Sequence, residues 1–201
     1  MGKIMILNGS PRAPISNSKQ YAEIFARFCK IETVYHNITK TNHTVLCAEM
    51  SGFSDVLFVF PLYADSLPVG FLDFLKTLEN NPPVNKPTVS VLINCGFLEP
   101  EQNKVALQMI NLFCHRNNYE MGSVLMLGSG EAILKTPFKY AAVRAIRNLA
   151  VSVADKHYNT FNATMPLSKK MFCLAANIHW TLYGKKFGTT KKQMQTMRIE
   201  G

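Results

Sequence analysis

Residues near the amino terminus have the types and spacing of a phosphate-binding loop. An apolar run at residues 4–7 leads into Asn8-Gly9-Ser10-Pro11-Arg12, and Ser16-Asn17-Ser18 stands just before a helical pattern. Ser and Asn side chains donate hydrogen bonds, first-turn helix amides lack partners within the helix, and Arg12 adds a fixed positive charge. This arrangement predicts an anion site. The same residues also suit a simple helix cap.

Two further loops of unusual composition follow apolar runs later in the chain. Pro61-Leu62-Tyr63-Ala64 follows the run at 56–60, and Asn94-Cys95-Gly96-Phe97 follows the run at 88–93. In a parallel sheet the carboxyl ends of the strands lie at one edge, and ligands bind there. We therefore expect the three loops to converge on one site.

The hydrophobic pattern predicts the elements that position these loops. Continuous apolar runs predict buried strands at residues 3–8, 56–60, 88–93 and 123–127, with a weaker strand at 33–36. Apolar residues at helical spacing predict helices at 17–30, 69–79, 105–113 and 138–157. Strands that alternate with helices predict an α/β domain with a doubly wound parallel sheet and helices on both faces.

Composition excludes several classes of protein. The chain has 201 residues, of which 47% are hydrophobic, and this is enough for one domain with a substantial core. No apolar stretch approaches the roughly twenty residues of a membrane span, and no secretory leader is present, so we expect a cytoplasmic protein. The five cysteines and five histidines are dispersed. We therefore expect reduced thiols and no metal site.

Taken in order, the three loops resemble those of the flavodoxin-like family, and within it the NADPH-dependent FMN reductase branch. The similarity covers about residues 1–130. It implies an FMN prosthetic group bound at the edge of a five-stranded sheet ordered 2-1-3-4-5. The spacing matches neither the Walker loop nor the GxGxxG motif, which argues against a P-loop nucleotidase and the usual dinucleotide fingerprint.

The resemblance also implies which residues contact each part of the cofactor. The phosphate would be surrounded by Ser10, Arg12, Ser16, Asn17 and Ser18; the isoalloxazine and ribityl chain would be flanked by Pro61, Leu62, Tyr63 and Ala64; and the pyrimidine end would face Asn94, Gly96 and Phe97.

Some residues of these loops also have a purely structural interpretation. Tyr63 and Phe97 can stack on a flavin ring or can plug the end of the sheet. Asp65 can meet a ribityl hydroxyl or cap the next helix. Cys95 is expected to be a small buried residue, because nothing nearby indicates a lowered thiol pKa.

The function implied by the resemblance is that of an oxidoreductase. NADPH or NADH would transfer a hydride to bound FMN, which would reduce a quinone, free flavin or nitroaromatic acceptor. Because the cofactor carries the chemistry, we expect no catalytic side chain. Family members are often dimers, so a homodimer is expected.

Two alternatives remain open. One is a flavodoxin-type electron carrier without its own NAD(P)H turnover, although such carriers tend to be acidic and this chain is basic. The other is a flavin-free interaction module on the same fold. The family's iron-sulfur relatives carry a close cysteine cluster, and only Cys47 stands in that region, so we expect no cluster.

The positive charge is concentrated after residue 134. Residues 1–134 hold ten Lys and Arg against eleven Asp and Glu, whereas residues 135–201 hold twelve against two. Residues 1–160 are predicted to form the FMN-binding domain. Residues 161–201 are predicted to form a basic extension whose helix, near 171–182, packs on the domain or on a dimer partner.

Other partners for this extension rank lower. Binding to an anionic membrane surface through the basic tail is the second interpretation, and docking to an acidic protein is a separate alternative. Nucleic acid comes last, because no recognised base-reading motif accompanies the charge.

Overall fold

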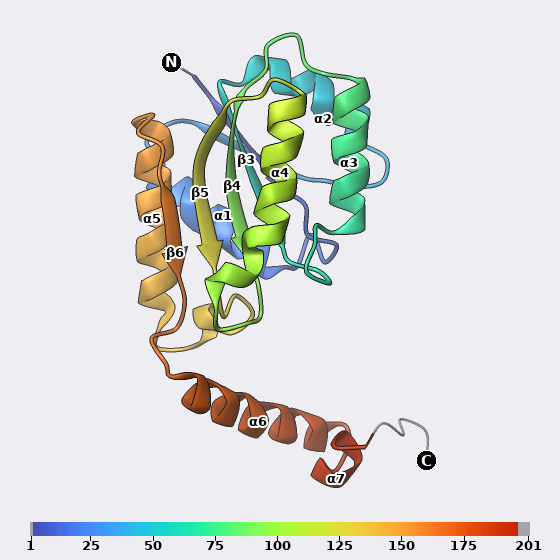
Figure 1. Ribbon diagram of the computed structural model, residues 1–201, viewed down its shortest axis with the longest axis vertical. Coiled ribbons are helices and arrows are strands. Elements are labelled where there is room, and N and C mark those ends of the chain that lie inside the picture. Colours follow the sequence, from blue (N-terminus) through green and yellow to red (C-terminus); the bar gives the residue numbers. More distant parts are fainter. Residues whose placement is uncertain (1, 197–201) are drawn as a thin grey trace. The chain divides into compact units, whose positions relative to one another are not determined.

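The computed structural model, which describes residues 2–196, contains one parallel sheet with the strand order β2-β1-β3-β4-β5-β6 (Figure 1). Helices alternate with these strands, so the predicted α/β architecture is confirmed. The strands are β1 (Ile4–Asn8), β2 (Thr33–Asn37), β3 (Asp55–Pro61), β4 (Thr88–Asn94), β5 (Met121–Leu127) and β6 (Thr160–Ala163). The helices beside them are α1 (Asn17–Phe28), α2 (His43–Glu49), α3 (Val69–Asn80), α4 (Lys104–Arg116) and α5 (Lys139–Ala154), with short 3-10 turns at η1 (Met50–Gly52), η2 (Pro100–Asn103) and η3 (Ile133–Lys135).

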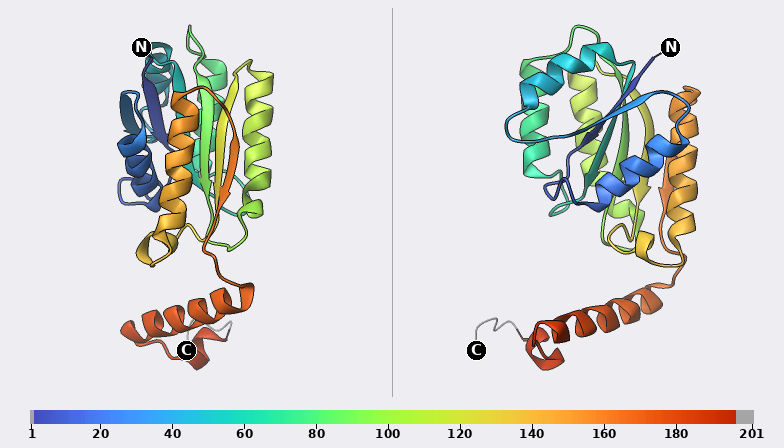
Figure 2. Two further views of the ribbon diagram at one scale, coloured as in Figure 1. Left: turned by 90° about the vertical axis from the view of Figure 1, so that its left-hand side faces the viewer. Right: turned by 180° about the vertical axis from the view of Figure 1, so that it is seen from behind.

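The central strands are apolar along their length because helices cover both faces of the sheet. Helices α1 and α5 lie on one face, and α3 and α4 lie on the other (Figure 2). In the register of β1 and β3, Ile6 pairs with Leu57 and Leu7 with Phe58. All four side chains are fully buried.

Aromatic side chains form much of the core on the α3 side. The Phe58 ring lies edge-on to Phe71 and Phe74 of α3, with centroids 5.1 and 6.3 Å apart. Such contacts add to the free energy gained by burying the rings. These ring contacts hold α3 against β3. They therefore also fix both ends of the loop that connects β3 to α3.

Two elements differ from the sequence prediction. The sheet has six strands and not five, because β6 adds to the edge of β5 with a parallel register from Val124–Thr160 to Leu127–Ala163. No residue of β6 is buried, so it lacks the apolar run that marks a strand in the sequence. Helix α2 was also not predicted, because it has only seven residues and buries only Leu46 and Cys47.

The chain divides into two compact units, one ending at Met165 and the other starting at Pro166. The first unit, which we call the sheet unit, therefore runs past the boundary predicted at residue 160, because β6 belongs to the sheet. The second unit contains α6 (Lys169–Lys186) and α7 (Lys191–Met194). A helix in this region was predicted from the sequence, and the structure contains it.

Candidate functional site

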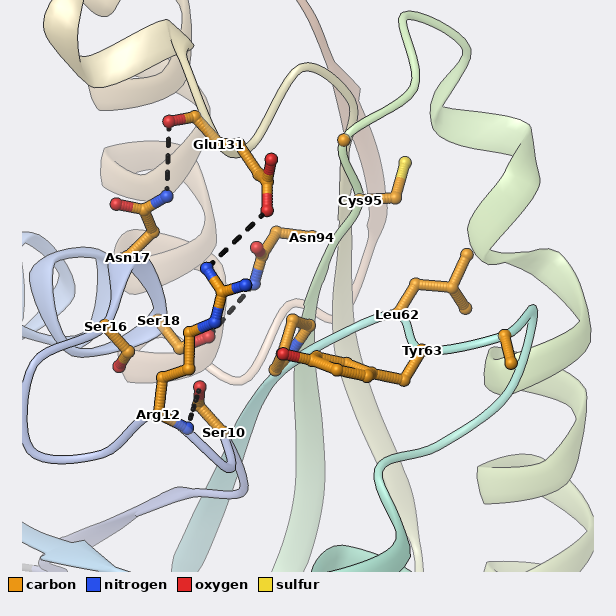
Figure 3. Close-up of a pocket in the computed structure, with 13 residues that line it drawn as sticks. Ser10, Arg12, Ser16, Asn17, Ser18, Leu62, Tyr63, Asn94, Cys95 and Glu131 are labelled. Atoms are coloured by element: carbon orange, nitrogen blue, oxygen red, sulfur yellow. Dashed lines mark hydrogen bonds and ion pairs between the residues drawn. The ribbon is translucent and has the colours of Figure 1, made fainter. Parts of the chain in front are cut away.

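A pocket of about 270 Å³ lies where β1, β3 and β4 end (Figure 3). It brings together every site residue predicted from the sequence except Phe97, and adds Cys95 and Glu131. The lining residues are Ser10, Arg12, Ser16, Asn17, Ser18, Pro61, Leu62, Tyr63, Ala64, Asn94, Cys95, Gly96 and Glu131.

The loop between β1 and α1 is shaped by Asn8, the last residue of β1. The backbone N–H of Ser10 donates to Asn8 Oδ1 at 3.0 Å, and Asn8 Nδ2 donates to Ser16 Oγ at 3.3 Å. Ser16 is the N-cap of α1, since its hydroxyl also accepts from the Lys19 amide at 3.1 Å. The first turn of α1, with Asn17 and Ser18, therefore opens directly onto the pocket.

Gly9 allows this loop to approach α3 closely. A Cβ at this position would lie 2.9 Å from the Phe71 ring, which is closer than side chains normally come. The loop thus depends on glycine for its position against the core.

The loop after β3 contains a two-residue turn. Tyr63 and Ser66 exchange backbone hydrogen bonds of 3.0 and 2.9 Å, and Ala64 and Asp65 between them have φ values of 46° and 56°. Positive φ at both central residues is typical of a tight type I′ turn. The Tyr63 side chain is 40% exposed and lies on one side of the pocket, between Leu62 and Arg12 in the view of Figure 3.

Asn94 links the three loops of the pocket through hydrogen bonds. Its buried amide donates to Ser18 Oγ of α1 at 3.1 Å and to the Phe60 carbonyl of β3 at 3.0 Å. The Leu62 amide in turn donates to the Asn94 carbonyl at 2.7 Å. The side chain of Asn94 therefore organises the pocket rather than facing a ligand.

A fourth loop, between β5 and α5, completes the pocket. Asn17 Nδ2 donates to the carbonyls of Gly130 and Glu131 at 3.1 and 3.3 Å, and Tyr21 OH donates to Gly130 at 2.5 Å. Arg12 Nη1 lies 4.0 Å from Glu131 Oε1, with both side chains largely exposed. Asn17, one of the predicted phosphate ligands, is therefore also a structural link between two loops.

Sequence reasoning missed Glu131 as a lining residue, although a signal for it exists. It follows Gly128-Ser129-Gly130, which comes directly after a buried strand, as the other three loops do. Cys95 lies within a predicted loop but was not assigned to the site. Phe97 does not line the pocket: its side chain is 52% exposed, and its carbonyl accepts a hydrogen bond from the Ser129 amide at 2.5 Å.

Two groups, the Cys95 thiol at the pocket and the Tyr21 hydroxyl that bonds to Gly130, have pKa values above their ordinary ones. Burial raises the pKa of the Cys95 thiol. The pKa of Tyr21 is raised strongly, mainly by burial and further by Cys95 and Glu131. A protonated thiol is a poor nucleophile, so Cys95 is not suited to covalent catalysis. Within residues 2–196, no group of three or more His, Cys, Asp or Glu is arranged to hold a metal ion.

Comparison with known proteins identifies the fold. No family model and no curated protein matches the sequence. Solved structures do match: a flavodoxin from Streptococcus pneumoniae TIGR4 has 15% identity and a TM-score of 0.58, over 77% of this chain and 99% of that one. The NAD(P)H:quinone oxidoreductase from Methanothermobacter marburgensis has 15% identity and a TM-score of 0.53, over 74% and 96%.

An FMN-dependent NADH-azoreductase from Bacillus anthracis, solved in complex with FMN, has 13% identity and a TM-score of 0.53, over 79% of this chain and 100% of that one. At these identities the likeness shows the fold alone. The sheet unit has a flavodoxin-like fold.

Proposed function

We propose that this flavodoxin-like chain binds FMN in the pocket and is an NAD(P)H-dependent oxidoreductase of the FMN reductase or quinone reductase type. The observation that carries the proposal is the convergence of two chemically different surfaces in one pocket. Hydroxyl, amide and guanidinium groups from the β1–α1 loop lie on one side, and Leu62 and Tyr63 lie on another.

The donors on the first side fit a phosphate. Ser10, Ser16 and Ser18 present hydroxyls at the pocket wall, and the amides of Asn17 and Ser18, which begin α1, have no acceptor within the helix. The positive end of the helix dipole favours an anion at this point. Arg12 adds a cation that faces Glu131, so a bound phosphate would compete with that carboxylate for the guanidinium.

The second side fits a flat, largely apolar ring. Tyr63 offers an aromatic face and Leu62 an aliphatic contact, while Gly96 leaves its backbone accessible beside the ring. The tight turn at Ala64 and Asp65 holds Tyr63 in place before a ligand arrives. These features support contacts to an isoalloxazine group by Pro61, Leu62, Tyr63 and Ala64, and backbone contacts by Asn94 and Gly96.

The similar structures support the redox assignment. Among them are proteins described as an FMN-dependent NADH-azoreductase and an NAD(P)H:quinone oxidoreductase. By analogy we propose NADPH or NADH as co-substrate, and a quinone, flavin or nitroaromatic compound as acceptor. We also propose a homodimer, on the analogy with the family.

FMN would supply the redox chemistry: it accepts a hydride from a nicotinamide and passes electrons to the acceptor. The residues of this chain bind and orient it. The β1–α1 loop would hold the phosphate end, Tyr63 and Leu62 would contact the ring, and the Cys95 thiol, whose pKa is raised by burial, would add no charge. Within this pocket we assign no side chain a proton-transfer role.

A titration of the protein with FMN, followed by flavin fluorescence, tests the proposal. We expect one FMN per chain and bleaching of the visible flavin band when NADPH or NADH is added. Bound FMN that neither nucleotide reduces would indicate a flavin-binding electron carrier. Failure to bind FMN would overturn the site assignment.

A matched pair of variants tests the phosphate side. Arg12→Ala should weaken FMN binding about tenfold, because a charge-assisted contact to phosphate is lost, and should leave riboflavin binding unchanged. Arg27→Ala removes an exposed arginine in the last turn of α1, away from the pocket, and should change neither affinity. Equal weakening of FMN and riboflavin by Arg12→Ala would contradict a phosphate contact.

A further inference from the structure

Asn8, the last residue of β1, is completely buried next to the pocket without being one of its lining residues. Its side-chain amide forms hydrogen bonds with the β1–α1 loop on one side and with β2 on the other. The register of the sheet brings these groups together, because Asn8 pairs with Asn37 of β2. Tyr35, two residues before Asn37, lies on the same face of β2.

The Ser10 backbone fixes the orientation of the Asn8 amide. A backbone N–H can only donate, so the Asn8 atom 3.0 Å from Ser10 N is the oxygen, Oδ1. The nitrogen, Nδ2, therefore points the other way, toward Ser16 Oγ at 3.3 Å, Tyr35 OH at 2.8 Å and Asn37 Oδ1 at 3.2 Å. Two acceptors of β2 thus hold Nδ2 as a donor beside Ser16.

Tyr35 uses its own proton within this network. Its hydroxyl donates to Asn37 Oδ1 at 2.6 Å and leaves its oxygen free to accept from Asn8. Burial raises the pKa of Tyr35 above its ordinary value, so the hydroxyl keeps this proton at neutral pH. Every proton between β1 and β2 therefore has a defined direction.

The direction of the Asn8 bond decides what the Ser16 hydroxyl can do. A serine hydroxyl can accept two hydrogen bonds and donate one. Ser16 Oγ accepts from Asn8 Nδ2 and from the Lys19 backbone amide, at 3.3 and 3.1 Å, and neither of these groups can accept in return. Within residues 2–196 the Ser16 hydroxyl donates to no protein acceptor. Its proton is therefore left for a ligand in the pocket that Ser16 lines.

The other two serines of the pocket have the same polarity. Ser10 Oγ accepts from the Arg12 amide at 3.3 Å, and Ser18 Oγ accepts from Asn94 Nδ2 at 3.1 Å. The Asn94 amide is oriented by the Phe60 carbonyl, which can only accept, at 3.0 Å. Three hydroxyl oxygens that already accept from the protein leave three protons for a ligand. A group with acceptor oxygens alone, such as a dianionic phosphate, matches this pattern.

We propose that Asn8 is a positioning residue that makes the Ser16 hydroxyl a proton donor to a terminal phosphate oxygen of FMN. This inference rests on the proposed function. It adds that affinity for the phosphate depends on a side chain outside the pocket, which Tyr35 and Asn37 hold in one orientation. An acceptor in place of Asn8 Nδ2 would draw the Ser16 proton away from the ligand without changing the shape of the pocket wall.

Asn8→Asp makes this exchange, because it replaces the donor Nδ2 by an acceptor oxygen of similar size. The Ser16 hydroxyl should then donate to the new carboxylate. We expect FMN affinity to fall at least about thirtyfold, since a charge-assisted hydrogen bond is lost and a negative charge is added. Riboflavin lacks the phosphate, so its affinity should change less than about twofold. Fluorescence titrations with FMN and with riboflavin measure both.

Asn37→Asp is the matched control, because it adds the same charge at the neighbouring position. Asn37 Oδ1 is already an acceptor from Asn8 and Tyr35, so this variant preserves the direction of every bond that leads to Ser16. Charge alone should weaken FMN binding about threefold. Equal losses of FMN affinity in Asn8→Asp and Asn37→Asp would overturn the proposal.

Tyr35→Phe tests the same network without adding charge, and decides the question if Asn8→Asp does not fold. It removes the nearest acceptor of Asn8 Nδ2 and should lower FMN affinity about threefold relative to riboflavin. Tyr119→Phe removes a buried hydroxyl that has no partner among the described residues, just before the amino end of β5, and should change neither affinity. A purely structural role of Tyr35 would leave the ratio of the FMN and riboflavin affinities unchanged, and that result would contradict the proposal.

Inorganic phosphate separates this inference from the proposed function. The parent protein and Asn37→Asp should broaden the phosphorus NMR signal of added phosphate, and Asn8→Asp should not. This result would support the Ser16 contact even if the parent bound no FMN. Tight FMN binding by the parent together with an undiminished ratio of FMN to riboflavin affinity in Asn8→Asp would overturn the inference alone. A parent protein that binds neither FMN nor inorganic phosphate would overturn both.

Discussion

Large apolar side chains have opposite environments in the two units of this chain. In the sheet unit, Phe58, Phe71 and Phe74 are almost completely buried against one another. In α6, Leu174, Ile178 and Trp180 are half exposed or more. The first set is explained by contacts within its own unit. The second set is also large and apolar, but these side chains lie at the surface of their unit, so burial alone does not explain their residue types.

The largest expected difference between the two units concerns core packing. Phe58→Ala should lower the free energy of unfolding by about 4 kcal/mol, because it removes a buried ring that packs on Phe71 and Phe74. Leu174→Ala in α6 should change it by less than about 0.5 kcal/mol. Urea unfolding followed by circular dichroism measures both, since Trp180 reports only on α6. A large loss for Leu174→Ala would show that α6 packs on folded protein.

The next largest difference in stability is expected between substitutions of one asparagine in each unit. Asn94→Ala removes donors from the Ser18 hydroxyl and the Phe60 carbonyl, and buried groups left unpaired should lower the free energy of unfolding by about 2 kcal/mol. Asn177→Ala, at an exposed position of α6, should leave the free energy of unfolding within about 0.5 kcal/mol of the parent. The same urea titration applies. Equal effects would contradict the structural role given to Asn94.

Removing the two helix caps should give a smaller difference in stability than the two asparagine substitutions. Ser16 caps α1 and Ser168 caps α6, through hydrogen bonds from Lys19 N at 3.1 Å and Met171 N at 3.3 Å. Ser16→Ala should lower the unfolding free energy of the sheet unit by about 1 kcal/mol. Ser168→Ala should reduce the helical circular dichroism of α6 and leave the unfolding midpoint of the sheet unit unchanged. A shift of that midpoint would show that the cap of α6 also contributes to the stability of the sheet unit.

Titration of the buried thiols should have the smallest effect on the free energy of unfolding near neutral pH. Burial raises the pKa of Cys47 to about 11 and that of Cys114 to about 12 from an ordinary value of 9.0. The unfolded chain loses these protons first as pH rises. Stability is therefore unaffected below about pH 9 and falls between pH 9 and the folded-state values. Unfolding midpoints at pH 7, 9 and 10.5 measure the decline.

Thiol alkylation at neutral pH gives the matching comparison between units. Cys173 of α6 is exposed, whereas Cys47 and Cys114 are buried. Iodoacetamide should therefore modify Cys173 long before the other two in the folded protein. Mass spectrometry of the modified peptides identifies the order, and fast modification of Cys114 would contradict the packing of α4.

Much of the sheet unit was predictable because its strands are continuously apolar. Phe58 and its neighbours mark β3 without ambiguity, and the rule that ligands bind at the carboxyl edge placed three loops together. The strand β6 was not predictable, since its pairing with β5 depends on backbone hydrogen bonds and not on buried side chains. Helix α2 was too short for periodicity to show.

The pocket was predictable in its loops but not in its cross-links. The hydrogen bonds of Asn17 to Gly130 and of Asn94 to Ser18 join positions that only the folded sheet brings together. Glu131 lies in the loop after β5. Its place at the pocket wall depends on the hydrogen bonds from Asn17 to the carbonyls of this loop. Phe97 shares its loop with Asn94 and Gly96 but does not line the pocket, so a flavin contact by Phe97 stays a prediction.

The bond from Asn17 to Gly130 spans 113 positions of the chain and has a consequence for folding. Contacts between such distant positions form late, because a long loop must close before they contribute. During synthesis, the pocket is incomplete until β5 and the loop that follows it have emerged and docked. A ligand of this pocket therefore selects the state in which β1, β3, β4 and β5 are assembled, and its binding energy adds to resistance against unfolding of that assembly rather than to the stability of any single loop.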